Sequence, residues 1–363
     1  MGALRALRGA FALAVFACAA EDGGGDLAER YDVGVIPITG GQACADCTIA
    51  LAHVVSIDPT DEPLPRQLDS HLTRDARGRF YVAPTYVDGV FTVYGPDGRF
   101  LRTVGRFGSG PGELRYPQFV HRFGVDSLLV VDVGLGRGVV LDSGYAVART
   151  FLYALPRARS IALRDDGIVV LPYAAERNGP PLQLMDWNGK PLQAFGVPLR
   201  VEGTVPFATT SDGGTWLVRP KEYVLEHYDR AGALTRVLRR DAAWFEPWTE
   251  DGIPRQPAVR SVAIGAEGIL WTLVSRPVRG WKEPAPRVAP DGAHPLPISL
   301  TDLDAGYDFM IEAIDPAEGI VLASLEVAEG YFKEFMDEEH VYAMREDDAG
   351  VIQFDVFRFT LSR

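Results

Sequence analysis

The sequence contains no run of 18 consecutive apolar residues, and this absence argues against a membrane-spanning helix. Lysine is scarce: the 36 basic residues include only four lysines, at positions 190, 221, 282 and 333. Acidic residues number 49, which gives a net charge of −13. Because proteins that bind nucleic acid neutralise its phosphates with basic surfaces, this balance argues against nucleic acid as a partner.

Signatures of common enzyme classes are also missing. The chain has no Gly-x-Ser-x-Gly elbow, no Gly-Lys-Ser/Thr phosphate loop and no His-Glu-x-x-His zinc motif. We therefore predict no catalytic residue and no cofactor. A binding or scaffolding module is the first functional hypothesis.

The chain has only three cysteines. Cys44 and Cys47 form an isolated pair in a chain that we expect to be exported, and this favours a disulfide. Thr48 directly after Cys47 excludes a c-type haem site, and a zinc site would need two further ligands. A redox-active pair would precede a helix, whereas the residues after Cys47 alternate as in a strand.

The N-terminus has the pattern of a targeting segment. Arg5 and Arg8 precede a short apolar stretch over residues 10–17, as in a signal peptide. Residues 15–18 resemble a bacterial lipobox, which would make Cys18 the lipidated first residue. Cleavage after residue 19 or 20 without lipid is the alternative. We expect a signal peptide over 1–17, a tether and N-terminal segment over 18–43, and one domain over 44–363. The protein would then be periplasmic or lie at a membrane surface.

Four tight turns recur at a nearly constant spacing. Their glycines, Gly98, Gly144, Gly189 and Gly232, are 46, 45 and 43 residues apart. Each turn separates two runs of alternating apolar residues, as in a β-hairpin. A period of 40–50 residues is typical of propellers and solenoids. These repeats predict an all-β fold, a six-bladed β-propeller.

The last repeat, within residues 332–361, supplies only three strands. Thr48–Ile57 is a strand-like run that belongs to no repeat, so we expect it to complete the last blade and close the ring. Five blades remain the alternative if the last segments pair differently. A proline-rich insertion over about 277–305 interrupts the fifth repeat.

The first repeat carries the most specific motif. A turn–strand–turn unit ends in the glycine-rich loop Phe107-Gly108-Ser109-Gly110-Pro111-Gly112-Glu113. This unit resembles the NHL-type repeat of six-bladed β-propellers, a group that also includes TolB-like proteins. The resemblance covers residues 48–363 and implies a bacterial exported member.

Known six-bladed propellers include calcium-dependent lactonases and esterases, which hold the metal with Asn, Asp and Glu. This chain has only Asn178 and Asn188, both in outer loops or turns of the third repeat, so the metal pattern of those enzymes is not met.

The candidate ligand-binding residues lie near the starts of the innermost strands of the first three repeats. His71 and His121 are expected to face the central channel. Arg74, Arg122 and Arg159 would add a basic mouth suited to a small anionic ligand, or they are ordinary loop residues. A zinc site would need His340 as well, and we predict no metal. A metal-dependent hydrolase or lyase with its site in the channel is the alternative function.

Three tryptophans in or beside the fifth repeat are candidates for binding an envelope protein: Trp244, Trp248 and Trp281. Packing between blades is the other use for them. The acidic last two blades are a further candidate surface, since residues 301–350 carry 15 acidic and two basic residues. We expect a monomer or part of a larger complex, with the lipid as the only membrane attachment.

Overall fold

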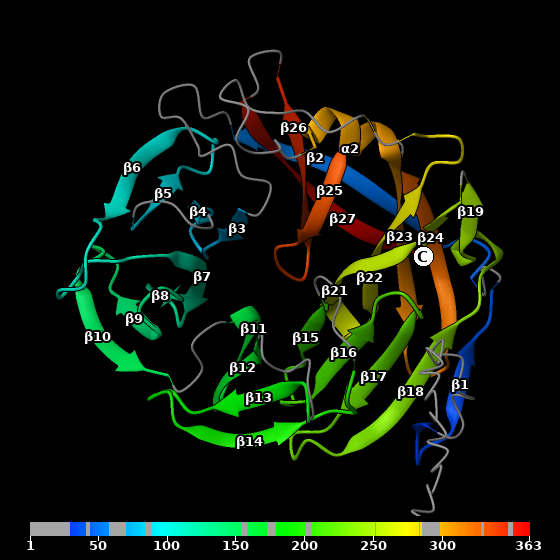
Figure 1. Ribbon diagram of the computed structural model, residues 1–363, viewed down its shortest axis with the longest axis horizontal. Coiled ribbons are helices and arrows are strands. Elements are labelled where there is room, and N and C mark those ends of the chain that lie inside the picture. The colour runs from blue at the N-terminus through cyan, green and yellow to red at the C-terminus, as the bar shows by residue number, and fades with distance from the viewer. Residues whose placement is uncertain are drawn as a thin grey trace, which may run out of the picture.

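A computed structural model describes residues 30–40, 44–57, 70–83, 89–153, 158–172, 179–199, 205–250, 252–282, 284, 298–327, 330–347 and 351–363. Cys18, the expected signal peptide and residues 283 and 285–297 of the insertion in the fifth repeat lie outside these residues. Six antiparallel sheets surround a central axis as the blades of a propeller (Figure 1). The predicted six-bladed β-propeller is confirmed.

Each of the first three blades uses four consecutive strands, ordered from the axis outward. Blade one contains β3 (His71–Arg74), β4 (Phe80–Ala83), β5 (Val90–Tyr94) and β6 (Phe100–Gly105). Blade two contains β7 (Pro117–Phe123), β8 (Ser127–Asp132), β9 (Arg137–Leu141) and β10 (Val147–Leu152). Blade three contains β11 (Ala158–Arg164), β12 (Gly167–Pro172), β13 (Leu182–Met185) and β14 (Pro191–Phe195).

Blades four to six each include a departure from this plan. Blade four contains β15 (Phe207–Thr209), β16 (Thr215–Arg219), β17 (Val224–Tyr228) and β18 (Leu234–Arg240), with β1 (Val35–Ile38) added outside. Blade five contains β21 (Ala258–Ile264), β22 (Leu270–Pro277), β23 (Tyr307–Asp315) and β24 (Ile320–Val327). Blade six contains β25 (Tyr331–Phe335), β26 (His340–Glu346), β27 (Ile352–Ser362) and, outermost, β2 (Thr48–Ile57).

The ring closes as the sequence predicts. β2 pairs antiparallel with β27, from Thr48 opposite Ser362 to Ile57 opposite Phe354. The first strand of the ring thus becomes the fourth strand of the last blade. Closure removes the edge that β27 would otherwise expose.

β1 is not predicted from the sequence. It pairs in parallel with β18, and the next bridge, between Thr39 and Ile320, reaches the outer strand of blade five. The segment then continues toward β2 in blade six. We call residues 30–40 the N-terminal strap, because they bind the outside of blades four and five.

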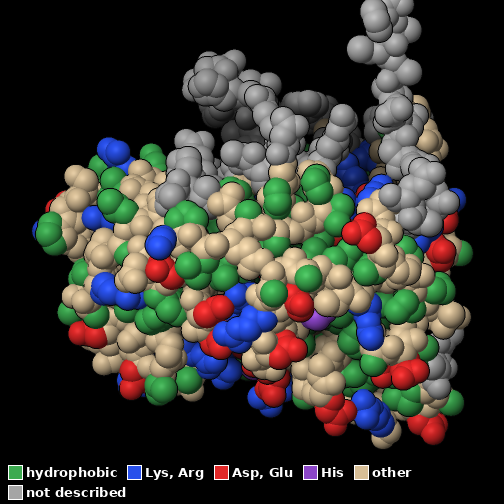
Figure 2. All heavy atoms as spheres, turned by 90° about the horizontal axis from the view of Figure 1, so that it is seen from below, with side chains coloured by type: hydrophobic (Ala, Val, Ile, Leu, Met, Phe, Trp, Pro, Cys, Tyr) green, Lys and Arg blue, Asp and Glu red, His purple; other side chains and the backbone are tan. Residues whose placement is uncertain are grey.

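One hydrophobic cluster of described residues lies at each of the six interfaces between neighbouring blades. The second strands are buried on both faces, so β4, β8 and β12 read as almost continuous apolar runs. The outer strands β6, β10 and β14 are largely exposed. Seen from the side, hydrophobic, basic and acidic side chains are interspersed over the visible face (Figure 2).

The four predicted turns join the third and fourth strands of blades one to four. Gly98, Gly189 and Gly232 have φ of +77°, +79° and +74°, a conformation that favours glycine. In blade two the equivalent residue is Tyr145, with φ +68°, and not the expected Gly144. Tyr145 tolerates this conformation because packing holds it: the Arg79 Nη1 donates to its hydroxyl at 2.9 Å.

Short elements lie between the blades and within blade five. η2 (Ala243–Phe245), β19 (Trp248–Glu250) and β20 (Ile253–Arg255) separate blades four and five, and η3 (Ala266–Gly268) joins β21 to β22. α2 (Leu300–Gly306) precedes β23, where Ser299 caps it by accepting a hydrogen bond from the Asp302 amide. Among the described residues, no helix is long and apolar enough to cross a membrane.

Candidate binding site

The six innermost strands converge on a cavity of about 140 Å³ in the central channel. Each strand contributes at least one lining residue: His71 from β3, His121 from β7, Ser160 from β11, Phe207 from β15, Arg260 from β21 and Glu334 from β25. We call these residues the channel site. Its walls combine aromatic rings with a few polar groups, which is the composition of a small-molecule site.

Glu334 connects blade six to blade one at the edge of this cavity. His71 Nδ1 lies 3.0 Å from Glu334 Oε1, and the Tyr342 hydroxyl donates to the same oxygen at 2.8 Å. Burial raises the pKa of Glu334, but His71 and the two hydrogen bonds outweigh it and hold the pKa at about 2. Glu334 is therefore a carboxylate at neutral pH.

His121 is a neutral side chain at the same cavity. Burial lowers its pKa to about 4, and the nearby His71 lowers it further than burial alone would. Its Nε2 is buried and has no hydrogen-bond partner in the described part of the chain. The Phe119 ring stacks on the His121 ring at 6.3 Å and lies 4.7 Å from His71. His121 thus offers one unused polar atom in an aromatic setting.

Arg260 supplies the positive charge of the channel site. Its Nε donates to Ser275 Oγ at 2.8 Å, and its guanidinium carbon lies 5.6 Å from the centre of the Tyr307 ring. It forms no ion pair with any residue that the structure describes. Since a buried or half-buried cation is usually paired, Arg260 has the capacity to bind an anion.

The channel site includes two of the five predicted ligand-binding residues, His71 and His121. Arg74 ends β3, and its guanidinium lies 6.0 Å from the Phe80 ring. Arg122 is exposed on β7, and Arg159 lies on β11; neither lines the cavity. His340 starts β26 outside the channel and pairs with Asp337 at 2.8 Å.

The sequence analysis does not identify Arg260 and Glu334 as residues that line the channel. The pairing of β21 with β22 shifts register between Val259 and Ser261, so Arg260 sits in a β-bulge. The pairing of β25 with β26 shifts between Phe332 and Glu334. A bulge redirects side chains, so simple alternation cannot identify the residues that face the channel. The sequence carries no local signal that would have identified these two residues.

The structure does not bring the three candidate tryptophans together. Trp244 packs against Tyr223 and Phe245, within the cluster between blades four and five. Trp248, on β19, has the Arg279 guanidinium 5.7 Å from its ring. Trp281 is half-buried, 6.4 Å from the Tyr307 ring and 5.4 Å from the Arg255 guanidinium. All three tryptophans are half-buried.

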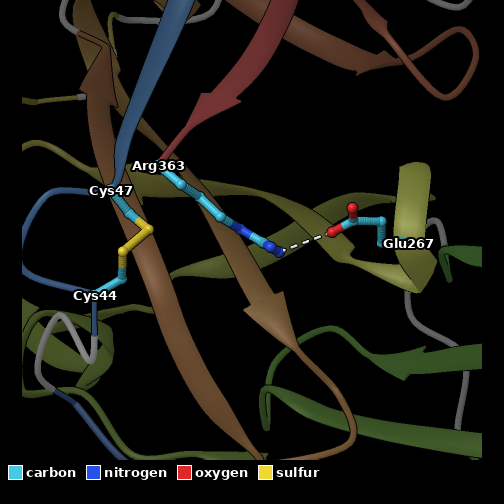
Figure 3. Close-up of a disulfide and its surroundings, with 4 residues drawn as sticks. All are labelled: Cys44, Cys47, Glu267 and Arg363. Atoms are coloured by element: carbon cyan, nitrogen blue, oxygen red, sulfur yellow. Dashed lines mark ion pairs between the residues drawn. A yellow bond between two sulfur atoms is a disulfide. The ribbon is translucent and has the colours of Figure 1, made fainter.

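Cys44 and Cys47 form the predicted disulfide, with their Cα atoms 5.2 Å apart, immediately before β2 (Figure 3). No group of three or more His, Cys, Asp or Glu side chains within the described ranges is arranged to hold a metal ion. In the channel, Nδ1 of His71 is engaged by Glu334.

Several solved structures share this fold. A member of the DUF4221 family from Bacteroides vulgatus superposes with a TM-score of 0.54 and 9% identity, covering 86% of this chain and 99% of that chain. A candidate exported protein from Bacteroides fragilis has a TM-score of 0.56 and 8% identity, covering 91% and 100%. No family model matches the sequence, and a comparison with curated proteins finds no match. These likenesses show the fold alone.

Proposed function

We propose that this protein is an exported, lipid-anchored β-propeller of the NHL-repeat type, a binding module that holds a small carboxylate ligand in its central channel. The observation that carries the proposal is Arg260. Arg260 lines a cavity to which the innermost strands of all six blades contribute, and it forms no ion pair with a described carboxylate. A guanidinium binds a carboxylate through two parallel hydrogen bonds, which gives both affinity and orientation.

The other polar groups of the channel site fit the same ligand. Neutral His121 has a buried Nε2 without a partner among the described residues, which donates a hydrogen bond to a carboxylate when the imidazole carries its proton there, and Ser160 lines the same cavity. Glu334 accepts a hydrogen bond from the Tyr342 hydroxyl at 2.8 Å and lies 3.0 Å from His71 Nδ1, so the carboxylate already present has its own hydrogen-bond partners. The volume of about 140 Å³ limits the ligand to a small molecule.

Binding of carboxylates to purified protein tests this proposal. Isothermal titration with acetate, succinate and citrate, and with acetamide as a neutral control, should show binding of at least one carboxylate and none of acetamide. R260Q should weaken that binding more than tenfold, because hydrogen bonds to a charged group contribute roughly 1.5–3 kcal/mol. The exposed Arg99 gives the matched control R99Q, which should bind as the wild type does. Equal binding by R260Q and the wild type would refute the proposal.

The export part of the proposal rests on the N-terminal sequence and is supported by the candidate exported protein of the same fold. Lipid on Cys18 would hold the propeller at the membrane, where an envelope protein is the expected macromolecular partner. Metabolic labelling with a radioactive fatty acid tests the anchor. The wild type should be labelled and membrane-bound, whereas C18S should be unlabelled and soluble. Equal labelling of the two proteins would exclude Cys18 as the attachment point.

A further inference from the structure

A second and larger cavity, of about 510 Å³, lies where blades five and six meet. Its rim is formed by the turn after β21, the turn after β25 and the end of β27 (Figure 3). We call it the blade five–six groove. It lies beside the Cys44–Cys47 disulfide and shares no lining residue with the channel site.

The floor of the groove is apolar, with one polar atom. Trp271 and Phe359 pack with their ring centres 4.6 Å apart, and Leu361 extends this floor. Trp271 is only 4% exposed, and its indole N–H has no hydrogen-bond acceptor among the residues described. Its Nε1 lies against the turn after β21, where a Cβ on Gly265 would be 2.4 Å away. The floor therefore offers one donor to a ligand that brings an acceptor, such as a peptide carbonyl.

The rim of the groove is charged. Glu267 pairs with Arg363 at 3.0 Å across the groove, as Figure 3 shows, and Glu339 pairs with Arg358 at 3.2 Å. Glu338 forms no ion pair with a described residue. Both ion pairs are more than half exposed, so each contributes no more than about 1 kcal/mol and exchanges readily.

The two arginines indicate what kind of side chain the groove accepts. Each already places a guanidinium against a rim carboxylate, and a third carboxylate, that of Glu338, remains available. The electrostatic potential of this part of the chain also favours a positively charged ligand, because residues 301–350 carry 15 acidic and two basic residues. Arginine suits this site better than lysine, since its planar group pairs with carboxylates and its long stem covers apolar surface.

We propose that the blade five–six groove binds an arginine-containing extended segment of a partner protein. The arginine stem covers Phe359 and Leu361, the guanidinium pairs with Glu338, and a backbone carbonyl accepts the Trp271 N–H. Arg363 competes with the incoming guanidinium for the same rim. This site is independent of the channel site.

Fluorescence anisotropy with a labelled acetyl-Gly-Arg-Gly-Arg-Gly amide peptide tests the proposal on the full-length protein. The peptide should bind, and the same peptide with citrulline, the uncharged analogue of arginine, should not. E338Q should weaken binding three- to tenfold. The matched control is E318Q, which removes an exposed carboxylate of blade five that does not line the groove and should change nothing.

The direction in which R363A changes the affinity for the peptide is the sharpest test. Because it removes the internal competitor, it should tighten peptide binding two- to fivefold, although it also removes an ion pair. Weaker binding by R363A, equal binding of the citrulline peptide, or equal effects of E338Q and E318Q would each overturn the proposal. Thermal unfolding of each variant shows whether it is folded. R260Q should bind the peptide normally, so failure here is distinguishable from failure of the channel proposal.

Discussion

At the scale of single residues, the propeller depends on ion pairs that are fully enclosed. Glu226 is 0% exposed and pairs with Arg219, and the hydroxyls of Tyr31 and Tyr228 donate to its two oxygens at 2.7 and 2.5 Å. Tyr31 belongs to the N-terminal strap, so this carboxylate also fixes the strap on blade four. A buried charge is tolerable only with such a complete set of partners.

A second enclosed pair joins blades four and five and supports a stability prediction. Glu312 is 0% exposed and accepts from Arg240 at 3.0 Å and from the Tyr223 hydroxyl at 2.7 Å. R240M should lower the free energy of unfolding by about 3–5 kcal/mol, because it leaves Glu312 buried without its cation. Urea denaturation measures this loss.

The neighbouring arginine provides the control for that measurement. Arg239 pairs with Asp241 at the surface, and both side chains are about half exposed or more. R239M should therefore cost less than about 1 kcal/mol. A similar loss in R240M and R239M would show that the enclosed pair has no special role.

His121 predicts a pH dependence of stability. Its folded pKa of about 4 lies below the ordinary 6.5, so the unfolded chain takes up a proton first as the pH falls. Stability should thus be lost between pH 6.5 and 4, by up to about 1.4 kcal/mol per pH unit, and level off below. In H121N, the free energy of unfolding measured by urea denaturation should change less between pH 6.5 and 4 than it does in the wild type. The separate loss from Glu334, between pH 4.5 and 2, should remain; an unchanged slope above pH 4.5 in H121N would contradict the assignment.

At the scale of elements, the disulfide fixes the start of the closing strand. Cys47 is 0% exposed and packs in the cluster between blades five and six, and its amide donates to the Cys44 carbonyl at 3.2 Å. The double variant C44S/C47S should lose about 2 kcal/mol of unfolding free energy, the chain-entropy value for a loop this short. Denaturation with and without reductant checks it. Reductant should destabilise the wild type but not the variant.

Elements with strong local signals are predictable from the sequence, and those that depend on distant pairing are not. Gly98, Gly189 and Gly232 indicate their turns because few other residues adopt that backbone conformation. β1 has no comparable signal, since four residues gain their place only by pairing with β18, which follows about 200 residues later. In the channel, His71 is predictable from its place at the start of β3, whereas the bulge at Arg260 depends on the β21–β22 register.

At the scale of the whole molecule, closure by β2 predicts that the chain can be reordered. A permutant that begins at Ser70 and carries residues 30–57 after Arg363, joined by a flexible linker, keeps Thr48 beside Ser362 and Tyr31 beside Glu226. It should fold to a monomer with the circular dichroism of the wild type. Residues 70–363 alone should aggregate, because β27 is then an unpaired edge beside exposed core. Equal behaviour of the two chains would show that β2 is dispensable.

The same closure has a consequence for the order of events during synthesis. Ser56, on β2, donates to Asp355, on β27, at 2.6 Å, although 299 positions separate them along the chain. A chain emerges from its N-terminal end, so the first strand of the ring is made long before its partner exists. Contacts this distant in sequence form slowly. Assembly of the ring is therefore a late step, completed only after β27 has been made, and β2 remains an unprotected strand until that moment.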